Sequence, residues 1–254
     1  MISMIKTILF DLDGTLLPID MEMFLKPYLR SLGEKCAHLI EPKRLIDLIL
    51  EATDAMINNL NPKRTNEEVF FEYFLSQVDT SRSIWEPLFS TFYEEDFPKL
   101  REYCGGSNLL ARVILKEVRD RGMDAIIATN PVFPMVAILE RMHWAGISDF
   151  QFKIITSYEN MHFCKPNVEY YEEILDMIGA DPEETLMVGN DMQEDMSASV
   201  IGIKTFLIED WLIDRGAPQY EPDFRGSLEE FCVFLRKHEL FNSKDEKLKR
   251  KSHF

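Results

Sequence analysis

The pattern of apolar residues constrains the fold more than any other feature of this chain, because its character changes near residue 105. Between about residues 21 and 100, apolar residues recur at the three- and four-residue spacing of helices, and no strand pattern intervenes. From about residue 105 onward, short apolar runs alternate with helical patterns. Such alternation is typical of a parallel sheet covered by helices on both faces. We therefore predict an α/β fold that carries an inserted, all-helical segment.

The same periodicities place the individual elements. A first strand is expected over residues 5–10. The helical segment is expected to hold helices over residues 21–32, 42–59, 65–78 and 81–92. Later strands are expected over residues 123–128, 152–156, 185–188 and 204–208. Later helices are expected over residues 107–121, 134–142, 167–178, 195–201 and 227–236.

This order of elements predicts two domains and a tail. Residues 1–17 and 104–241 would form a Rossmann-like core domain, and residues 18–103 a helical cap domain. Residues 242–254 contain a basic run and are expected to form a flexible C-terminal tail. A chain of 254 residues, 46% of them hydrophobic, is large enough for a core and a smaller second domain.

Charge and cysteine usage narrow the classes of function. The net charge of −16 repels nucleic-acid phosphates and anionic membranes, so neither is expected as a partner. No apolar stretch approaches the roughly 18 residues of a membrane span, and the N-terminus does not resemble a signal peptide. The 4 cysteines are scattered without CxxC spacing, which favours free thiols and a cytoplasmic location. Both a monomer and a homodimer remain open.

Two acidic residues, Asp11 and Asp13, directly follow the first predicted strand in the run Asp-Leu-Asp-Gly-Thr. Carboxylates at the end of a buried strand are costly unless water, protons or a cation compensates them. Gly14 lets the chain turn, so both acids can reach the mouth of the sheet. An aspartate placed there can coordinate Mg2+ and can also attack phosphorus, which favours an aspartyl-phosphate intermediate.

Further polar groups follow the later predicted strands. These are Thr129 with Asn130, then Lys165 after a short loop, and finally Asp191 with Asp195. Ligands of an open parallel sheet bind beyond the carboxyl ends of its strands. We therefore expect these side chains to share one site with the acids after the first strand.

In this order, the groups resemble the four motifs of the haloacid dehalogenase-like superfamily, most of whose members are phosphatases. The first motif, DxDx[TV], is matched by residues 11–15. The second, a Ser or Thr after a strand, is matched by Thr129, and the third, a Lys usually followed by Pro, by Lys165. The fourth is an acidic pair such as GDxxxD, matched by Asp191 and Asp195.

Two further features bear on this resemblance. Asn190 is inserted after Gly189, so the fourth motif departs slightly from its commonest form, and Glu194 offers a second acidic candidate at the same spacing. The helical insertion after the first motif resembles the C1-type cap of the superfamily. Within it, Met21, Met23 and Phe24 follow the first motif closely and would either line a substrate pocket or pack in the core.

The resemblance implies catalytic roles for several residues. Asp11 would be the nucleophile, and Asp13 would be the general acid and base. Thr129 and Lys165 would bind the transferring phosphoryl group, with Lys165 neutralising its charge. The substrate would also contact the backbone of Asn130. Thr15 would shape the turn, with its hydroxyl either bonding the phosphate or bonding Asp11.

The resemblance also implies a metal site. Mg2+ would be held by the Asp11 carboxylate, the Asp13 backbone carbonyl and Asp191, and few protein ligands suffice because Mg2+ keeps several waters. Asp195 would hold Lys165 or a metal-bound water.

The resulting prediction is a Mg2+-dependent phosphatase that hydrolyses a small phosphorylated metabolite through an aspartyl phosphate. A phosphomutase or another phosphotransferase of the same superfamily is the alternative, because it uses the same core residues. A haloacid dehalogenase needs neither metal nor a second aspartate, so Asp13 and Asp191 argue against it. A non-catalytic module that kept a metal site is a further alternative, which metal-dependent turnover would separate from the enzyme.

Overall fold

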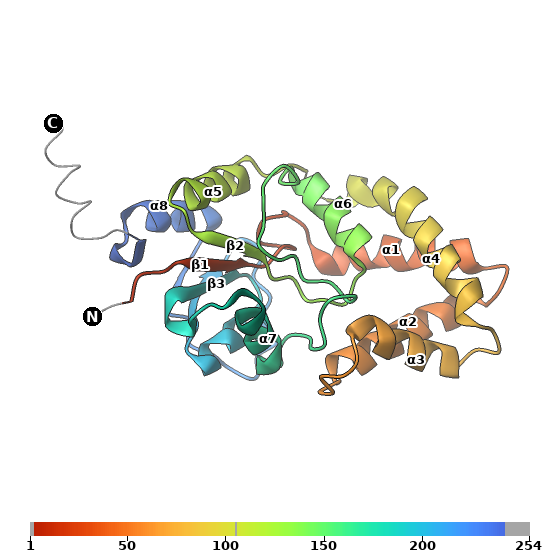
Figure 1. The fold of residues 1–254 in the computed structure, drawn as a ribbon. Coiled ribbons are helices and arrows are strands. Elements are labelled where there is room, and N and C mark those ends of the chain that lie inside the picture. Colours follow the sequence, from red (N-terminus) through yellow and green to blue (C-terminus); the bar gives the residue numbers. More distant parts are fainter. Residues whose placement is uncertain (1–2, 105, 242–254) are drawn as a thin grey trace, which may run out of the picture.

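A computed structural model describes residues 3–104 and 106–241 of the chain. At its centre lies a 5-stranded sheet in the order β2-β1-β3-β4-β5, in which all neighbouring strands run parallel (Figure 1). The strands are β1 (Thr7–Phe10), β2 (Asp124–Ile127), β3 (Thr185–Gly189), β4 (Lys204–Ile208) and β5 (Phe224–Gly226). The predicted α/β fold with a parallel sheet is therefore confirmed.

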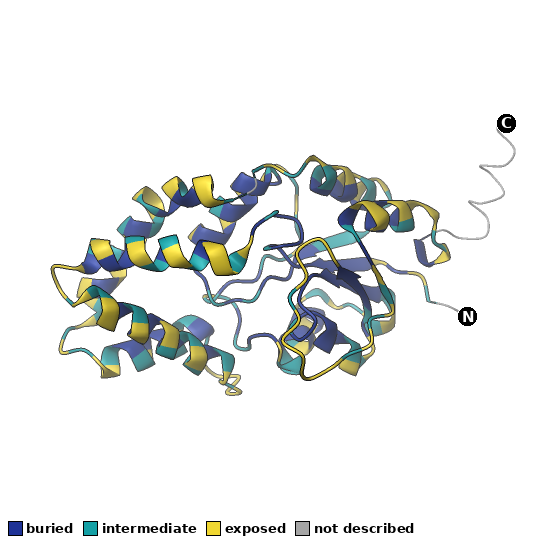
Figure 2. Cartoon of the chain, turned by 180° about the vertical axis from the view of Figure 1, so that it is seen from behind, coloured by how far each residue is buried: buried dark blue, intermediate teal, exposed yellow. Residues whose placement is uncertain are grey.

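Helices cover both faces of the sheet, because successive residues of a strand point to opposite faces. Ile8 and Phe10 of β1 belong to the core beneath α5 (Leu109–Asp120) and α8 (Leu228–Lys237). Leu9 belongs to a separate cluster with residues of α7 (Val168–Ile178) and of the 3-10 helix η3 (Met196–Ile201). The sheet is accordingly buried on both sides, as the dark ribbons of Figure 2 show.

The inserted segment forms a helical unit beyond the carboxyl ends of the strands (Figure 1). Its elements are α1 (Met21–Cys36), α2 (Pro42–Ile57), α3 (Asn66–Ser76), α4 (Arg82–Glu95) and the 3-10 helix η1 (Phe97–Tyr103). Aromatic residues hold it together, since the rings of Phe74 and Trp85 lie 4.9 Å apart between centroids. The stacked rings of Phe97 and Trp144, 5.1 Å apart, join the unit to α6 (Met135–Ala145).

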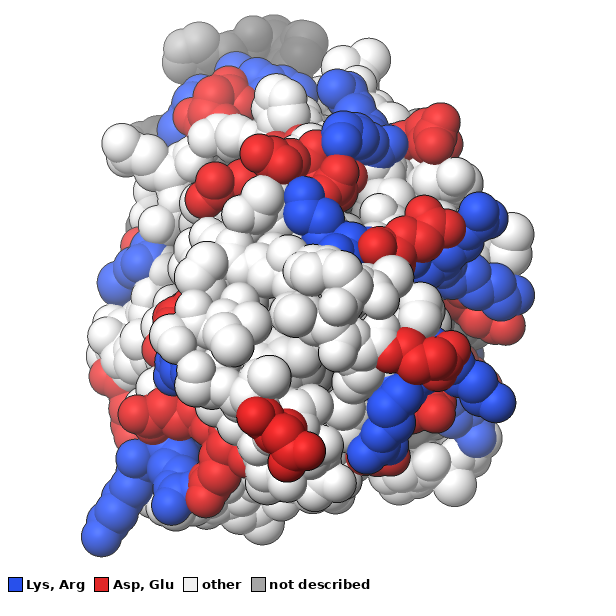
Figure 3. All heavy atoms as spheres, turned by 90° about the vertical axis from the view of Figure 1, so that its right-hand side faces the viewer, with Lys and Arg blue, Asp and Glu red and all other residues white. Residues whose placement is uncertain are grey.

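The outer end of the molecule, on the side of this helical unit, carries charges of both signs. Figure 3 shows lysine and arginine side chains interleaved with aspartates and glutamates around a central uncharged area. Oppositely charged neighbours on such a surface form ion pairs, for example Arg82 with Glu67 and Glu86. Exposed pairs of this kind contribute little to stability, typically about 0–1 kcal/mol each.

Side-chain hydrogen bonds cap several helix starts. The Thr65 hydroxyl accepts a hydrogen bond from the Glu68 backbone N–H, and the Glu68 carboxylate accepts one from the Thr65 N–H, so α3 begins with a complete capping box. At α1, the Asp20 carboxylate accepts from the Met23 N–H. Such caps satisfy backbone donors that the helix itself leaves unpaired.

Two expected elements differ in the structure. Residues 152–156 do not form a strand; one parallel bridge, between Ile127 and Ile155, joins this segment to β2. The Thr156 hydroxyl donates to the backbone carbonyls of Ile127 and Thr129, which ties the segment down through a side chain. The helix expected over residues 195–201 is the short 3-10 helix η3, which ends at Gly202 with a φ of 88°.

The structure contains some elements that the sequence did not predict. η1 and β5 were not expected, and neither were the short 3-10 helices η2 (Pro182–Glu184) and η4 (Glu239–Phe241). The predicted tail, residues 242–254, lies outside the described residues. Within residues 3–104 and 106–241, no helix has the length and apolar character needed to cross a membrane.

Candidate active site

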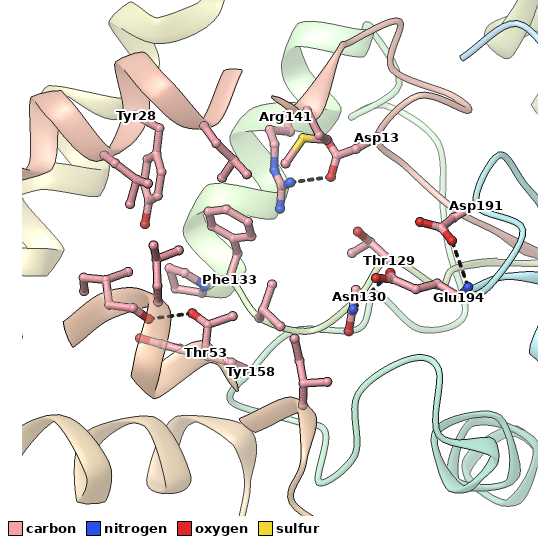
Figure 4. A pocket seen from close by; sticks show the side chains of 18 of the residues that line it. Asp13, Tyr28, Thr53, Thr129, Asn130, Phe133, Arg141, Tyr158, Asp191 and Glu194 are labelled. Atoms are coloured by element: carbon pink, nitrogen blue, oxygen red, sulfur yellow. Dashed lines mark hydrogen bonds and ion pairs between the residues drawn. The ribbon is translucent and has the colours of Figure 1, made fainter. Parts of the chain in front are cut away.

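The candidate site lies where the carboxyl ends of β1, β2 and β3 meet. Asp11 directly follows β1, and its backbone N–H donates to the Val188 carbonyl of β3 over 2.9 Å. On the other side, the Ala128 N–H donates to the Phe10 carbonyl over 2.7 Å, which brings the end of β2 beside β1. A cavity of about 290 Å³ opens here between the strand ends and the helical unit (Figure 4).

Lys165 lies buried between two carboxylates. Its ammonium Nζ is 3.0 Å from Oδ1 of Asp11 and 2.6 Å from Oδ1 of Asp195. The lysine side chain is only 1% exposed. Its backbone is held by Asn130, whose Oδ1 accepts from the Lys165 N–H and whose Nδ2 donates to the Lys165 carbonyl. One cation therefore serves two buried acids.

The pKa values of these groups reflect that shortage of positive charge. Burial raises the pKa of Asp11 to about 6, although Lys165 pulls it down. Burial likewise raises the pKa of Asp195 to about 7 against the same lysine. For Lys165 burial alone would lower the pKa, but the charges of Asp11 and Asp195 raise it well above its usual value. The lysine therefore stays charged while the two acids compete for it.

Asp13 makes a buried ion pair with Arg141 of α6. Oδ2 of Asp13 accepts from Nη1 of Arg141, while Asp13 Oδ1 is buried without a hydrogen-bond partner among the described residues. The guanidinium stacks 4.4 Å from the centroid of the Phe133 ring and is 1% exposed. Burial raises the pKa of Asp13, and Arg141 opposes this shift. Asp13 therefore keeps one carboxylate oxygen, Oδ1, that no described group bonds.

The loop after β3 presents Asp191. Its Oδ1 accepts from the backbone N–H groups of Gln193 and Glu194, at 3.0 and 2.9 Å. Nη1 of Arg215 lies 2.7 Å from Oδ2 of Asp191, and this arginine side chain is 51% exposed. Asp195 in turn accepts from the Asp191 N–H through Oδ2, over 2.9 Å. Burial, reinforced by the charge of Asp191, raises the pKa of Glu194 to about 7.

Two glycines leave room for side chains of the loop that follows β3. Gly14 has a φ of 77°, and a Cβ atom at this position would collide with the Asn190 side chain. At Gly189 a Cβ atom would collide with the carboxylate of Asp195. The Asn190 side chain also accepts a 3.1 Å hydrogen bond from the Thr15 hydroxyl.

The structure brings most of the predicted residues to one cavity. Its lining includes Asp11, Asp13, Thr129, Asn130, Asp191 and Asp195. Lys165 lies behind Asp11 and Asp195 rather than in the lining. Thr15 is buried, and its hydroxyl bonds Asn190, so its contact with substrate stays a prediction. Of the three candidate pocket residues on α1, Met21 lines the cavity, whereas Phe24 packs in the core and Met23 is 61% exposed.

Two arginines of the site were missed at the level of sequence. Arg141 had a detectable signal, because it follows Ala137 and Ile138 by four and three residues and so lies on the buried face of a helix. A charge on an apolar helix face usually has a buried partner. Arg215 lies in the loop between β4 and β5, where no periodic pattern singles it out.

The oxygen-rich lining suits a hard cation. Five carboxylates line the cavity (Asp11, Asp13, Asp191, Glu194 and Asp195), and the lining cations Arg141 and Arg215 are engaged in ion pairs. Within the described ranges, no group of three or more His, Cys, Asp or Glu side chains is gathered as a metal cluster. Mg2+ takes only one or two carboxylates and keeps several waters, so such a cluster is not required. The donor chemistry therefore fits Mg2+.

This fold and site define a class of hydrolases, and the comparison with known families agrees. The family model described as "Haloacid dehalogenase-like hydrolase" matches residues 8–208, from within β1 to the end of β4. The chain belongs to this family.

Individual relatives are distant. The pyrophosphatase PpaX of Halalkalibacterium halodurans is 24% identical over 226 residues, which cover 87% of this chain and 91% of the relative. A HAD phosphatase from Thermococcus onnurineus has a similar structure, with a TM-score of 0.57, 20% identity and coverage of 91% of this chain and 98% of that one. The L-2-haloacid dehalogenase of Xanthobacter autotrophicus has a TM-score of 0.56 and 14% identity. The match covers 92% of this chain and 100% of the dehalogenase chain. Likeness to the two solved structures shows the fold alone.

Proposed function

We propose that this protein is a Mg2+-dependent phosphatase that hydrolyses a small-molecule phosphomonoester through an aspartyl phosphate on Asp11. The observation that carries this proposal is the arrangement of Asp11. Lys165 bonds its Oδ1, and this leaves Oδ2 to attack a ligand in the cavity. A carboxylate needs no general base to become a nucleophile, because it is already ionised above its pKa.

The first transfer uses Asp11 and Asp13 together. Asp11 forms a bond to phosphorus as the ester P–O bond breaks, and Asp13 gives its proton to the leaving oxygen. Lys165 offsets the negative charge on Asp11 and on the moving phosphoryl group. Thr129 and the backbone of Asn130, both in the cavity lining, are proposed to hold the phosphoryl oxygens.

In the second transfer, Asp13 takes a proton from a water molecule, whose oxygen attacks the phosphorus. The Asp11–phosphorus bond breaks, and inorganic phosphate leaves. The raised pKa of Asp13 suits this double role, because a carboxyl that titrates closer to neutral pH exchanges its proton more readily in both directions.

A bound Mg2+ would be held by the Asp11 carboxylate, the Asp13 carbonyl and Asp191. Mg2+ at this position supplies positive charge that neutralises the phosphoryl oxygens. The Gln193 and Glu194 backbone N–H groups orient the Asp191 carboxylate toward the cavity. Arg215 occupies part of the same carboxylate, so the arginine and the metal would compete for Asp191.

We also propose roles for the two domains, a partner and a cellular location. Residues 1–17 and 104–241 would act as the catalytic core, and residues 18–103 as a cap that supplies the far wall of the cavity. A small phosphorylated metabolite would be the partner. A cytoplasmic location is supported by the free cysteines, three of which are buried as thiols.

Hydrolysis of inorganic pyrophosphate is the second candidate function. It is favoured by the name of the PpaX relative, which matches 87% of this chain. It uses the same nucleophile and differs in the leaving group, which would be a phosphate instead of an alcohol. Phosphomutase chemistry on the same residues remains an alternative. Dehalogenation is disfavoured because it has no use for Asp13 and Asp191.

Turnover assays test the proposal. Purified full-length protein is incubated with a panel of phosphomonoesters and with pyrophosphate, with Mg2+ or with EDTA, and phosphate release is measured. Turnover that needs both Mg2+ and Asp11 supports the proposed phosphatase. If pyrophosphate is the only compound that releases phosphate, the protein is a pyrophosphatase and the phosphomonoesterase proposal is wrong. Absence of turnover on every compound by folded protein in Mg2+ would overturn the hydrolase proposal.

A further inference from the structure

The cavity has two ends of opposite character (Figure 4). The end at the strands is acidic and holds Asp13, Thr129 and Asp191. The other end is formed by the helical unit and by the segment after β2. There Tyr28, Phe133 and Tyr158 face the space among aliphatic and aromatic neighbours, most prominently Leu25, Leu29, Ile49, Phe70 and Phe89. A phosphate bound at the acidic end would point its ester group into this apolar end.

Little positive charge is available to a second anionic group. Among the described residues that line the cavity, the cations are Arg141 and Arg215. Arg141 is bound to Asp13 through Nη1, whereas its Nη2 has no hydrogen-bond partner among the described residues. Arg215 is bound to Asp191 and Glu194. Both arginines already offset carboxylates of the cavity, so a leaving group with negative charges of its own, such as a second phosphate, would be buried beside apolar walls with little counter-charge. Burial of an uncompensated anion is very costly.

Few free hydrogen-bonding groups are available to a polyol. The hydroxyls of Tyr28 and Tyr93 lie 2.8 Å apart and bond each other. The Thr53 hydroxyl donates to the Ile49 backbone carbonyl over 2.8 Å. Tyr158 adds one further hydroxyl to the lining. A sugar or glycerol moiety would leave several of its own hydroxyls buried without partners, which lowers its affinity.

We propose that the phosphomonoester taken by this site carries an uncharged apolar leaving group, an aryl-alkyl or branched alkyl alcohol. The inference rests on the proposed phosphatase function and deepens it by assigning the class of alcohol. The cavity of about 290 Å³ lies near the lower end of ligand pockets, which span about 300–1,000 Å³. One ring or a short branched chain therefore fills it. Burial of that group against α1, α2 and Phe133 supplies the selectivity.

Binding of non-hydrolysable analogues tests the inference separately from catalysis. Calorimetry on the full-length protein with Mg2+ compares three phosphonates in which CH2 replaces the bridging oxygen. These are 2-phenylethylphosphonate for benzyl phosphate, 3,4-dihydroxybutylphosphonate for glycerol 3-phosphate, and methylenediphosphonate for pyrophosphate. We expect the phenyl compound to bind at least about tenfold more tightly than either other compound, from the apolar area that it buries.

A matched pair of variants locates the selectivity on α1. Leu29→Gln places an amide in the cavity wall and is expected to reduce the preference for the phenyl compound at least about threefold. Met23→Gln changes an exposed residue of the same helix outside the lining, and is expected to leave the preference unchanged.

Each outcome decides a different point. Equal or tighter binding of methylenediphosphonate or of the dihydroxy compound overturns the apolar leaving group, even if the enzyme is a phosphatase. Preferential binding of the phenyl compound without turnover of benzyl phosphate supports the apolar site and counts against the proposed catalysis. Faster turnover of glycerol 3-phosphate than of benzyl phosphate at limiting concentration also overturns the inference.

Discussion

Two clusters in this molecule pair lysines with carboxylates in different proportions and at different depths. At the strand ends, one lysine, Lys165, lies between the two carboxylates of Asp11 and Asp195. At the junction of α4 and η1, the carboxylate of Asp96 lies between Lys35 and Lys99, with both ammonium groups 2.7 Å from its oxygens, and Lys35 also pairs with Glu95 over 3.3 Å. The Lys165 side chain is 1% exposed, whereas the side chains of Asp96 and Lys99 are 22% and 70% exposed.

The two clusters shift the pKa values of their acids in opposite directions. Hydrogen bonds from Lys35 and Lys99 lower the pKa of Asp96, because the partly exposed carboxylate keeps contact with water and burial opposes the two lysines only weakly. Burial raises the pKa of Asp11, because its lysine is shared and water is excluded. An ion pair at the exposed cluster therefore stabilises the fold slightly. In the buried cluster, the two carboxylates carry more negative charge than one lysine can offset. A bound metal cation would offset this remaining negative charge beside the proposed phosphoryl site.

The largest effect is expected on turnover when the buried cluster loses its nucleophile. Asp11→Asn removes the attacking oxygen but keeps the shape of the side chain. We expect phosphate release to fall on the order of 10⁴-fold or more, as for other nucleophile replacements. Steady-state assays measure it, with Asp96→Asn as a control that keeps near wild-type rates. If the variant retained a tenth of wild-type activity, Asp11 would not be the nucleophile.

Removal of the shared cation should be the most destabilising change. Lys165→Met leaves Asp11 and Asp195 buried without their lysine, and we expect the free energy of unfolding to fall by about 3–5 kcal/mol. Urea unfolding at pH 7.5 measures it. Lys35→Met in the exposed cluster is the matched control, for which we expect a much smaller loss, because water screens an exposed pair. Equal losses in the two variants would contradict the contrast between buried and exposed pairs.

The same buried cluster should become more stable when it loses an acid. The pKa of Asp11 is raised to about 6, so its ionisation destabilises the folded state above that pH. Asp11→Asn should therefore raise the free energy of unfolding by about 1–3 kcal/mol at pH 7.5, on the scale of 1.36 kcal/mol per pKa unit.

The pH dependence of this gain checks its sign. The gain is fully present above the folded pKa of about 6 and should shrink toward zero as the pH falls to the unfolded value of 3.8, since wild-type Asp11 is then protonated as well. Unfolding curves without Mg2+ at pH 7.5, 6 and 5 measure the trend. A gain that grows on acidification would show that the raised pKa is wrong.

The smallest effect is expected in the exposed cluster. Asp96→Asn removes an acid whose pKa is lowered by hydrogen bonds from Lys35 and Lys99, so its stabilising contribution is present at neutral pH and is lost below the unfolded pKa of 3.8. We expect a loss below about 1 kcal/mol at pH 7.5, which high salt reduces further. Thermal unfolding at two salt concentrations measures it, and a loss that is insensitive to salt would contradict a screened pair.

Much of the site could be predicted because its residues follow strands that are themselves evident in the sequence. The β1 and β3 runs are fully buried and continuous, so the positions of Asp11 and Asp191 follow from the strand ends alone. The exception among the strands, residues 152–156, has an apolar run, but its pairing with β2 is reduced to one bridge. β5 has only three residues, including an arginine and a glycine, and therefore lacks a strand pattern.

The partners of the site residues could not be predicted in the same way. Arg141 reaches Asp13 across 128 positions of sequence, and Arg215 reaches Asp191 from a loop. These pairs depend on how α6 and the β4–β5 connection pack, which no local period encodes. The apolar end of the cavity is similarly assembled from several helices, so its residues look like ordinary core positions until the chain is folded.

The two glycines at the loop contact have a consequence for mutational tolerance. Any side chain at Gly14 or Gly189 would meet Asn190 or Asp195, and at Gly14 the backbone conformation adds a second penalty. Selection for a folded chain, with no demand for catalysis, therefore favours glycine at both positions, most strongly at Gly14. A library that randomises them and sorts only for soluble expression should return glycine. These two positions therefore report on the integrity of the fold, although they lie beside the proposed catalytic residues.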